Sequence, residues 1–356
     1  MPQTITAGQW NRSLLHRQHL LARADEDAVE VIDRLVGMQS QDPTAAFYGL
    51  HCRIQDFQPD ELDELLTDRE IIRIALLRST IFLIDGADAR WIRPLAQPLL
   101  DTQRQTIYER RLVGADPAAV IADAEELLRA GPLGGDELGR ALAERHRSEA
   151  PTTLTSIARC ALPLVQIPPR GLWKGRGRPT YRLLDDWIGP GDPALEGDEA
   201  CRELIRLYLR GFGPSSVTAI QTWSGIGGLR PLVESMEREW ELAAYTGPQG
   251  QLLYDLEGLE VTDADQPAPV RLVAPFDHIL VSQADRGRIT HPDHFARIRT
   301  PNGISPGFIL VDGWLAGIWR RPPGTTRIEP ELFVTVPRRV RAELDDEVAR
   351  LESWIS

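Results

Sequence analysis

The order in which helical and strand patterns follow one another constrains the fold of this chain more than any single motif. A helical apolar face over residues 28–36 leads to Glu70–Ile84, which has the pattern of a β-hairpin. The same order, helices and then strands, recurs over residues 117–184 and again over residues 201–256. Helices followed by a hairpin are the order of a winged helix-turn-helix unit. We therefore expect three such units in tandem.

The last part of the chain has a different pattern. The acidic, proline-containing stretch Glu257–Pro269 is typical of a linker, and a final amphipathic helix is expected at about Arg338–Trp354. Between them, apolar runs predict strands at Val270–Val273, Ile279–Ser282, Phe308–Val311, Leu315–Trp319 and Leu332–Val336. The expected fold class is α+β and mainly α, with a C-terminal β-rich region and a terminal helix after the three units. The expected domains are residues 1–100, 101–192, 193–265 and 266–356.

Residues 167–182, with the sequence IPPRGLWKGRGRPTYR, concentrate positive charge without any acidic residue. The cations are Arg170, Lys174, Arg176, Arg178 and Arg182, and Lys174 is the only lysine of the chain. Three interspersed glycines let a backbone approach a ligand closely. Such a segment suits a polyanion, above all a nucleic-acid backbone, although an exposed and merely solvated hairpin has the same pattern. In the tandem arrangement this segment is the wing of the second unit.

The overall composition limits the classes of protein. The chain has 52 acidic against 40 basic residues, so any DNA binding must come from a local basic face. No apolar run reaches the length of a membrane span, and the N-terminal stretch is too polar for a secretory signal. Cys52, Cys160 and Cys201 are odd in number and scattered, which indicates reduced thiols and no zinc site. We expect a cytoplasmic monomer without metal or cofactor, associated with the nucleoid when bound to DNA.

Two glutamines stand at the expected end of the second helix, in the stretch GMQSQDP (Gly37–Pro43). Gln39 continues the apolar face by one turn, where a buried amide must find hydrogen-bond partners. Gln41 lies two residues further on, beside the break at Pro43, so both carboxamides can point into one cleft. Spacing alone favours a simpler role, in which both amides cap free carbonyls at the helix end.

The longer stretch GMQSQDPTAAFYGLHCRI (Gly37–Ile54) resembles the catalytic signature of the AlkZ/YcaQ family of bacterial DNA glycosylases, in its Gln-x-Gln form. That form resembles the azinomycin-resistance branch of the family. Further ordered resemblances are LLRSTIFLI (Leu76–Ile84), YLRGFGPSSVTAIQTWSG (Tyr208–Gly225), LVAPFDHILVSQADRGRI (Leu272–Ile289) and LVDGWLAGIWR (Leu310–Arg320). Together they cover nearly the whole chain.

The resemblance implies a DNA glycosylase that hydrolyses the N-glycosidic bond of N7-alkylated guanine in duplex DNA. It also implies the unhooking of interstrand crosslinks and self-resistance to a genotoxic natural product. Gln39 and Gln41 are then the catalytic residues, which position a water, and His51 is a possible neighbour or a packing residue. No lysine lies near the signature, so we expect a monofunctional enzyme without a Schiff-base step. The expected DNA-binding residues are Arg53, Arg73, Arg78, Arg170, Lys174, Arg176, Arg178, Arg286 and Arg288.

Alternatives remain open at this point. Salt-bridge roles fit Arg53, Arg73 and Arg78 equally well, and Arg286 and Arg288 can instead pair with Asp285 and Asp277. Three residues depart from the family pattern: Ser40, Phe82 and Gln283. The competing functions are a non-catalytic winged-helix DNA-binding protein or transcriptional regulator, and a protein-interaction scaffold. A regulator has no need for two amides at this place, whereas a scaffold has no salt-dependent affinity for DNA.

Overall fold

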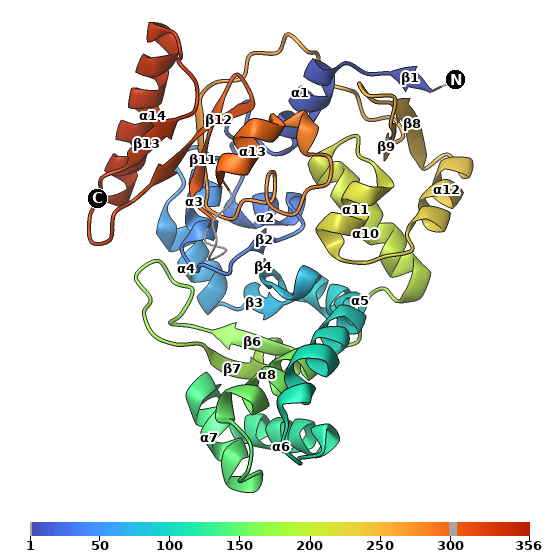
Figure 1. Ribbon diagram of the computed structural model, residues 1–356, viewed down its shortest axis with the longest axis vertical. Helices are drawn as coiled ribbons and strands as arrows, with labels where there is room; N and C mark the ends of the chain where they lie inside the picture. Colours follow the sequence, from blue (N-terminus) through green and yellow to red (C-terminus); the bar gives the residue numbers. More distant parts are fainter. Residues whose placement is uncertain (1, 299–304) are drawn as a thin grey trace.

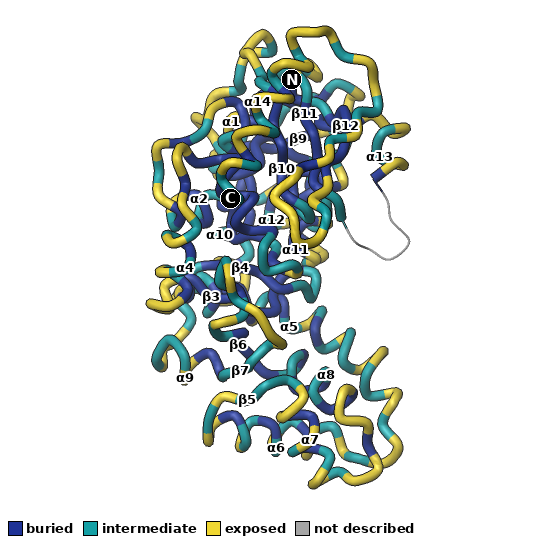
Figure 2. The backbone as a smooth tube through the Cα atoms, turned by 90° about the vertical axis from the view of Figure 1, so that its left-hand side faces the viewer, coloured by how far each residue is buried: buried dark blue, intermediate teal, exposed yellow. Residues whose placement is uncertain are grey.

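The fold is α+β and mainly α, as the sequence predicts. The computed structural model describes residues 2–298 and 305–356. Figure 1 shows one large body, from which helices α6 (Pro117–Ala130), α7 (Gly135–Arg145) and α8 (Pro151–Ala161) project at the bottom. In Figure 2 the buried backbone is concentrated around the strands of the body, and a smaller buried stretch runs through the projecting helices.

The first part of the chain consists of helices and a hairpin. Its helices are α1 (Ala7–Arg17), α2 (Ala28–Arg34), α3 (Ala45–His51) and α4 (Pro59–Thr67). The hairpin that was predicted over Glu70–Ile84 is present as the antiparallel strands β3 (Ile71–Ala75) and β4 (Ile81–Asp85). A short strand, β2 (Met38–Gln39), pairs with the other edge of β4.

The second part follows the long helix α5 (Gly86–Gln103), which continues through a π-helical turn at Arg104–Tyr108. Its strands are β5 (Leu133–Gly134), β6 (Leu164–Ile167) and β7 (Thr180–Leu183), followed by the short helix α9 (Leu184–Ile188). Helices α6 to α8 have an apolar cluster of their own that includes Val120, Leu142 and Leu154. A separate core explains why these helices can project from the body.

One six-stranded sheet joins the first two parts of the chain. Its strand order is β2-β4-β3-β6-β7-β5, and the two halves meet where Ile74 of β3 pairs with Val165 of β6. The sequence pattern predicted two separate hairpins. It did not predict their union, because edge-to-edge pairing depends on residues 91 positions apart, a separation given by the numbers of Ile74 and Val165.

The third part comprises α10 (Gly197–Phe212), α11 (Val217–Ser224), α12 (Arg230–Arg238) and the hairpin of β8 (Leu242–Thr246) and β9 (Leu252–Leu256). The N-terminal strand β1 (Gln3–Thr4) adds to β8 in parallel. Arg17 at the end of α1 donates 2.6 and 2.7 Å hydrogen bonds to the carboxylate of Asp255 in β9. The beginning of the chain is therefore built into the third part and not only into the first.

The C-terminal region contains a four-stranded antiparallel sheet of β10 (Arg271–Val273), β11 (Gly307–Val311), β12 (Trp314–Arg320) and β13 (Glu329–Leu332). Helix α13 (Pro292–Ile298) lies near β12, and helix α14 (Arg338–Ile355) closes the chain. The largest apolar cluster includes Phe82 of the first part, Trp223 of the third and Phe308 of this region. Val165 and Leu184 of the second part also belong to this cluster, so one continuous core unites residues of all four expected domains.

The structure corrects three expected elements. Ile279–Ser282 is not a strand, because the backbone N–H groups of Leu280 and Val281 turn back to the carbonyl of Asp277. The last strand is Glu329–Leu332 instead of Leu332–Val336, with a register fixed by pairing to β12. Gln39 lies on β2 and not at a helix end.

The early end of α2 accounts for the change at Gln39. The helix stops at Arg34 because Val36 and Gly37 both have positive φ values, 56° and 76°. A chain with two successive residues in this region cannot continue a right-handed helix. It leaves the helix and enters β2 instead.

Three histidines are held in the neutral form. Burial lowers the pKa of His19 to about 4, of His51 to about 3 and of His278 to about 4, with nearby arginines contributing in each case. The ring of His51 stacks on Trp354 of α14 with 4.4 Å between ring centroids. Protonation of any of these rings would place a positive charge in a buried or cationic surrounding.

We predict that the protein loses stability as the pH falls from about 6.5 toward 4. In this interval the three histidines bind protons in the unfolded chain, where their pKa is 6.5, but not in the folded chain. The unfolded state then binds more protons, so the free energy of unfolding decreases with falling pH. Urea unfolding at about pH 7.5 and about pH 5 should give the lower midpoint at acid pH.

The variant His51→Phe is the matched control, because it keeps an aromatic ring against Trp354 and removes one titrating group. The difference between its two midpoints should be smaller than in the unmodified protein. Identical differences would contradict a contribution from His51.

Candidate active site

Strand β2 fixes the position of Gln39. Its backbone pairs Met38 with Leu83 and Gln39 with Phe82, and the N–H of Ser40 donates a 2.7 Å hydrogen bond to the carbonyl of Ile81. Alternate side chains of a strand point to opposite faces. Met38 accordingly joins a buried apolar cluster, while Gln39 is only half-buried.

The carboxamide of Gln39 is oriented by Arg78. One guanidinium nitrogen of Arg78 donates a 3.1 Å hydrogen bond to Oε1 of Gln39, and the other donates to the carbonyl of Trp223 at the end of α11. Arg78 has a left-handed backbone, with φ 55°, in the tight turn between β3 and β4. Such strain is concentrated at functional sites. Burial lowers the pKa of Arg78 to about 10, so the side chain is still a cation at neutral pH.

Gln41 lies against the same strand. Its side chain is exposed, and its Oε1 accepts a 3.4 Å hydrogen bond from the backbone N–H of Ile81. Gln39 faces Phe82, the next residue of β4. The structure therefore brings Gln39, Gln41 and Arg78 together at the start of β4. The carboxamide oxygens of both glutamines accept hydrogen bonds from this hairpin, and Gln39 does not stand at a helix end.

Ser40, between the two glutamines, points the other way and is fully buried. Its hydroxyl accepts a 3.2 Å hydrogen bond from Nε of Arg73, and its carbonyl accepts a 2.9 Å hydrogen bond from Nη2. The expectation that Arg73 holds a DNA phosphate is wrong, because this side chain is 1% exposed and is used to fix the turn. The hydroxyl of Ser40 thus replaces an apolar residue with a hydrogen bond to a buried arginine.

Two further arginines that were expected to bind DNA are structural, which for Arg53 is the salt-bridge alternative left open by the sequence. Arg53 is fully buried, and its guanidinium forms a 2.8 Å ion pair with Asp277. Arg288 is 1% exposed and donates a 2.8 Å hydrogen bond to the carbonyl of Phe212. Neither guanidinium can reach a phosphate, because each would have to leave the partners that compensate its buried charge.

Phe82 and Gln283, which depart from the family pattern, are both fully buried. The guanidinium carbon of Arg78 lies 5.2 Å from the centre of the Phe82 ring. Gln283 accepts a 3.2 Å hydrogen bond from the hydroxyl of Tyr208 and donates a 2.9 Å bond to the carbonyl of His278. His51 packs on Trp354 and is 6% exposed, so its ring is occupied in packing α3 against α14.

The basic segment 167–182 combines an anchored residue with exposed cations. The ring of Trp173 packs against Phe47 with 5.2 Å between ring centroids, and its backbone N–H donates a 2.8 Å hydrogen bond to the carboxylate of Asp63. Lys174 and Arg176 are exposed. The indole therefore serves as an anchor and not as a flat surface among the cations, while the charges beside it face solvent.

The other predicted DNA-binding residues are more constrained. Arg178 is exposed but forms an ion pair with Asp136 of α7. Arg170 is half-buried and donates a 2.8 Å hydrogen bond to the carbonyl of Gly177. Arg286 is half-buried as well, with its guanidinium 4.3 Å from the centre of the Phe295 ring.

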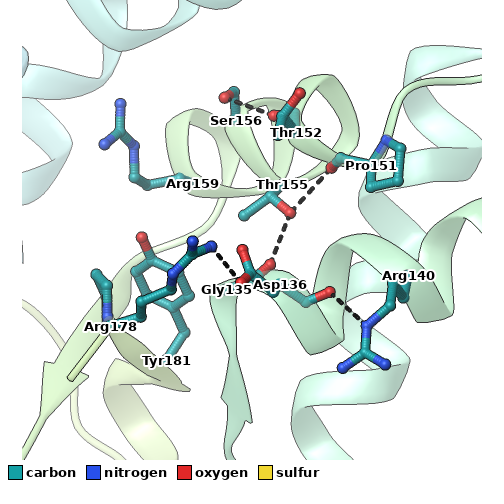
Figure 3. Close-up of a pocket in the computed structure, with 11 residues that line it drawn as sticks. Gly135, Asp136, Arg140, Pro151, Thr152, Thr155, Ser156, Arg159, Arg178 and Tyr181 are labelled. Atoms are coloured by element: carbon teal, nitrogen blue, oxygen red, sulfur yellow. Dashed lines mark hydrogen bonds and ion pairs between the residues drawn. The ribbon is translucent and has the colours of Figure 1, made fainter.

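A cavity of about 630 Å³ lies beside this segment, between α7, α8 and β7. Its charged and hydroxyl side chains include Arg140, Arg159, Arg178, Thr152 and Ser156. Figure 3 shows Arg178 next to Asp136 and the hydroxyl of Thr155 between Gly135 and Pro151. The cationic lining extends the positive surface of the basic segment onto the helices of the second part.

Two cavities lie near the glutamines, one lined by Gln39 itself and one by the residues that follow Gln41. One has a volume of about 340 Å³. It is lined by Asp42 and Thr44 of the signature turn, which is the turn at residues 40–44 after strand β2, and by Tyr48, Pro275 and Trp319 among others. The other has a volume of about 10 Å³ and lies between the strand residues Met38–Gln39 and the loop Ala274–His278. Pro275 borders both cavities, so they flank one wall of the site.

The sequence interpretation missed this wall. LVAPFDHIL was noted for its resemblance, but nothing in its residue types indicated that it faces Gln39 from more than 230 positions away, as the numbers of Gln39 and Ala274 give. In the described residues 2–298 and 305–356, no three His, Cys, Asp or Glu side chains are grouped to hold a metal ion. Nor do these residues contain a helix with the length and apolarity needed to cross a membrane.

Comparisons with known proteins identify the family. A family model described as DNA glycosylase AlkZ-like matches residues 32–354. The interstrand DNA cross-link repair glycosylase of Streptomyces sahachiroi is 24% identical over 341 residues, which cover 90% of this chain and 88% of that protein. The solved structure of Streptomyces sahachiroi DNA glycosylase AlkZ matches with a TM-score of 0.77 at 19% identity, covering 99% of this chain and 97% of that one. The two chains share a fold, and with the family model spanning nearly its whole length, this chain belongs to the AlkZ-like family of DNA glycosylases.

Proposed function

We propose that this chain is a monofunctional DNA glycosylase that hydrolyses the N-glycosidic bond of N7-alkylated guanine and unhooks interstrand crosslinks formed through such adducts. The observation that carries the proposal is the pair of accessible carboxamides, Gln39 and Gln41, which both accept hydrogen bonds from the β3–β4 hairpin, Gln39 from the cation of Arg78. The protein would act as a cytoplasmic monomer on duplex DNA, in repair or in self-resistance to an alkylating natural product.

Neutral amides suit this reaction because the substrate is already activated. Alkylation at N7 gives guanine a positive charge, so the base departs without protonation. The enzyme then has to place a water at the anomeric carbon and to stabilise an oxocarbenium-like sugar. Carboxamide oxygens can orient the water and set partial negative charge beside the sugar cation. Each amide oxygen has two lone pairs, so Gln39 can keep its bond to Arg78 while it binds a second donor.

The position of Arg78 fits a phosphate contact. A cation beside an oxocarbenium-like sugar is unfavourable by itself, but a DNA phosphate between them reverses the sign of the local charge. Arg78 is half-buried, in contrast to the sealed Arg53, Arg73 and Arg288. We therefore assign the phosphate next to the lesion to Arg78.

The cavity of about 340 Å³ beside the signature turn supports bulky adducts as substrates. Tyr48, Trp319 and three prolines give it an apolar and aromatic lining, and the hydroxyl of Tyr48 accepts a 2.6 Å hydrogen bond from Arg321. Small-molecule sites typically have a volume in this range and a mainly apolar and aromatic lining with a few polar groups. A substituent on N7 could enter here while the sugar stays at the glutamines.

The first prediction concerns the two amides. Gln39→Ala and Gln41→Ala should each lower the single-turnover rate of abasic-site formation on duplex DNA with N7-methylguanine by about 100-fold, because the orientation of the water is lost. Alkaline cleavage of the DNA measures the rate. Gln55→Ala, which removes an exposed glutamine after α3, is the matched control and should be unaffected.

The double variant separates an enzyme from a DNA-binding regulator. Binding to the lesion duplex, followed by fluorescence anisotropy, should change little when both amides are removed. If the unmodified protein forms no abasic sites with any N7-guanine adduct, or if the double variant cleaves as fast, the proposed catalytic role is wrong.

A second prediction tests the substrate cavity. Thr44→Phe places a ring in the cavity and should lower excision of N7-benzylguanine about tenfold while sparing N7-methylguanine. Thr44→Val removes the 2.9 Å hydrogen bond of the hydroxyl to Asp42 without filling the space, and serves as the control. Equal effects on both adducts would exclude the cavity as the site of the substituent.

A third prediction concerns the basic segment. Replacing both Lys174 and Arg176 with alanine should reduce the slope of log affinity against log salt concentration by about 1.8, because two phosphate contacts are lost. The control removes the same charge from Arg339 and Arg341, which pair with acidic residues on α14. A slope that falls equally in both variants would assign the effect to net charge alone.

A further inference from the structure

The smaller cavity beside Gln39 has the size of a single water. Its volume is about 10 Å³, and its walls are Met38, Gln39 and Ala45 on one side and the loop Ala274–His278 on the other. A water molecule needs roughly this room together with two to four polar partners. Gln39 is half-exposed, so its carboxamide connects the cavity to the surface on which the DNA would lie.

His278, which also lines this cavity, has a polar atom without a partner in the described part of the chain. The residue is 3% exposed, and its Nδ1 is buried without a hydrogen-bond partner among the described residues. A buried ring nitrogen without a partner is costly, and in proteins such atoms are normally bound to an ordered water. The cavity that His278 lines is the place for that water.

The loop around His278 is held rigidly. Asp277 is fixed by its ion pair with Arg53 and by the 3.1 Å hydrogen bond that it accepts from the N–H of Ile279. The carbonyl of His278 accepts a 2.9 Å hydrogen bond from Gln283, and its ring meets Phe212 edge-on at 5.0 Å. Phe276 has a φ of 61°, a strained conformation for a large side chain. Strain of this kind persists where the surroundings impose it, commonly at functional sites.

The imidazole of His278 is neutral at physiological pH. Burial lowers its pKa to about 4, the adjacent Asp277 opposes this, and the cations Arg53 and Arg78 lower it further. A neutral ring carries one nitrogen with a proton and one without. It can therefore bind a water without adding a charge next to the sugar cation.

Building on the proposed function, we propose that Nδ1 of His278 and the carboxamide of Gln39 hold one water between them, and that this water is the nucleophile. Its oxygen forms the bond to C1′ while the bond from C1′ to N9 of the alkylated guanine breaks. The electron pair of the broken bond leaves with the base, which becomes neutral, and one proton of the water is released to solvent. His278 is a positioning residue for this water and needs no change of its own protonation state.

The variants His278→Phe and His278→Asn test the proposal. Phenylalanine keeps the ring but loses Nδ1, whereas the amide of asparagine can occupy nearly the same place as Nδ1. On duplex DNA with N7-methylguanine, His278→Phe should lower the single-turnover rate by about 10–100-fold without changing the Kd for the DNA. His278→Asn should stay within about threefold of the unmodified rate. A His278→Phe protein as fast as the unmodified one would overturn the proposal.

A crystal structure of the unmodified protein provides a readout that does not depend on activity or on the folding of a variant. A water within hydrogen-bond distance of both Nδ1 of His278 and the carboxamide of Gln39 is expected, and a dry cavity would overturn the proposal. The two ideas fail separately. If the water is present but the protein is inactive on every N7-guanine adduct, the proposed function is contradicted. If the protein is active but the cavity is dry, only the role of His278 is contradicted.

Discussion

The ion pair between Arg53 and Asp277 is the interaction on which the rest of the site depends. Arg53 follows α3, the helix that continues from the Gln-x-Gln turn, and Asp277 lies in the loop opposite Gln39. Both side chains are buried, so loss of either one would strand a charge at a cost of about 3–5 kcal/mol. Hydrophobic packing alone would let these two segments slide. A buried ion pair is stable only when its two side chains stay in contact. The Arg53–Asp277 pair therefore holds the segment after α3 and the loop Ala274–His278 in one relative position, and it fixes both walls of the cavity beside Gln39.

Much of the fold follows from local sequence patterns. Strands β10, β11 and β12 and helix α14 lie within one residue of their predicted bounds, because short apolar runs and an amphipathic pattern mark them clearly. The position of Gln39 could not be predicted in the same way. Val36 adopts a positive φ that a β-branched residue rarely takes, and only the tertiary structure imposes it. Likewise, Ile279–Ser282 has the composition of a strand, but the turn around Asp277 prevents one.

The candidate site likewise has some features that could be predicted from the sequence and others that could not. The two glutamines are only two positions apart in sequence, so an extended backbone suffices to bring their side chains to the same face, and their proximity was predictable. The roles of the arginines were not. Arg53, Arg73 and Arg288 have the same residue type as exposed Arg176, and only their distant partners make them structural. A single sequence shows the charge of such a residue. It does not show the acid that neutralises this charge or the carbonyl that accepts its hydrogen bonds.

The anchoring of Trp173 connects recognition to folding. Its indole lies among aromatic residues of α3 and α14, while Lys174 next to it faces solvent. A polyanion that binds the exposed cations in this arrangement stabilises the state in which Trp173 is packed between α3 and α14. By thermodynamic linkage, that packing in turn raises the affinity for the polyanion. Nucleic acid would thus act as a stabilising ligand for the junction between the ends of the chain. Loss of this packing would then favour release of the polyanion, and release of the polyanion would favour loss of the packing.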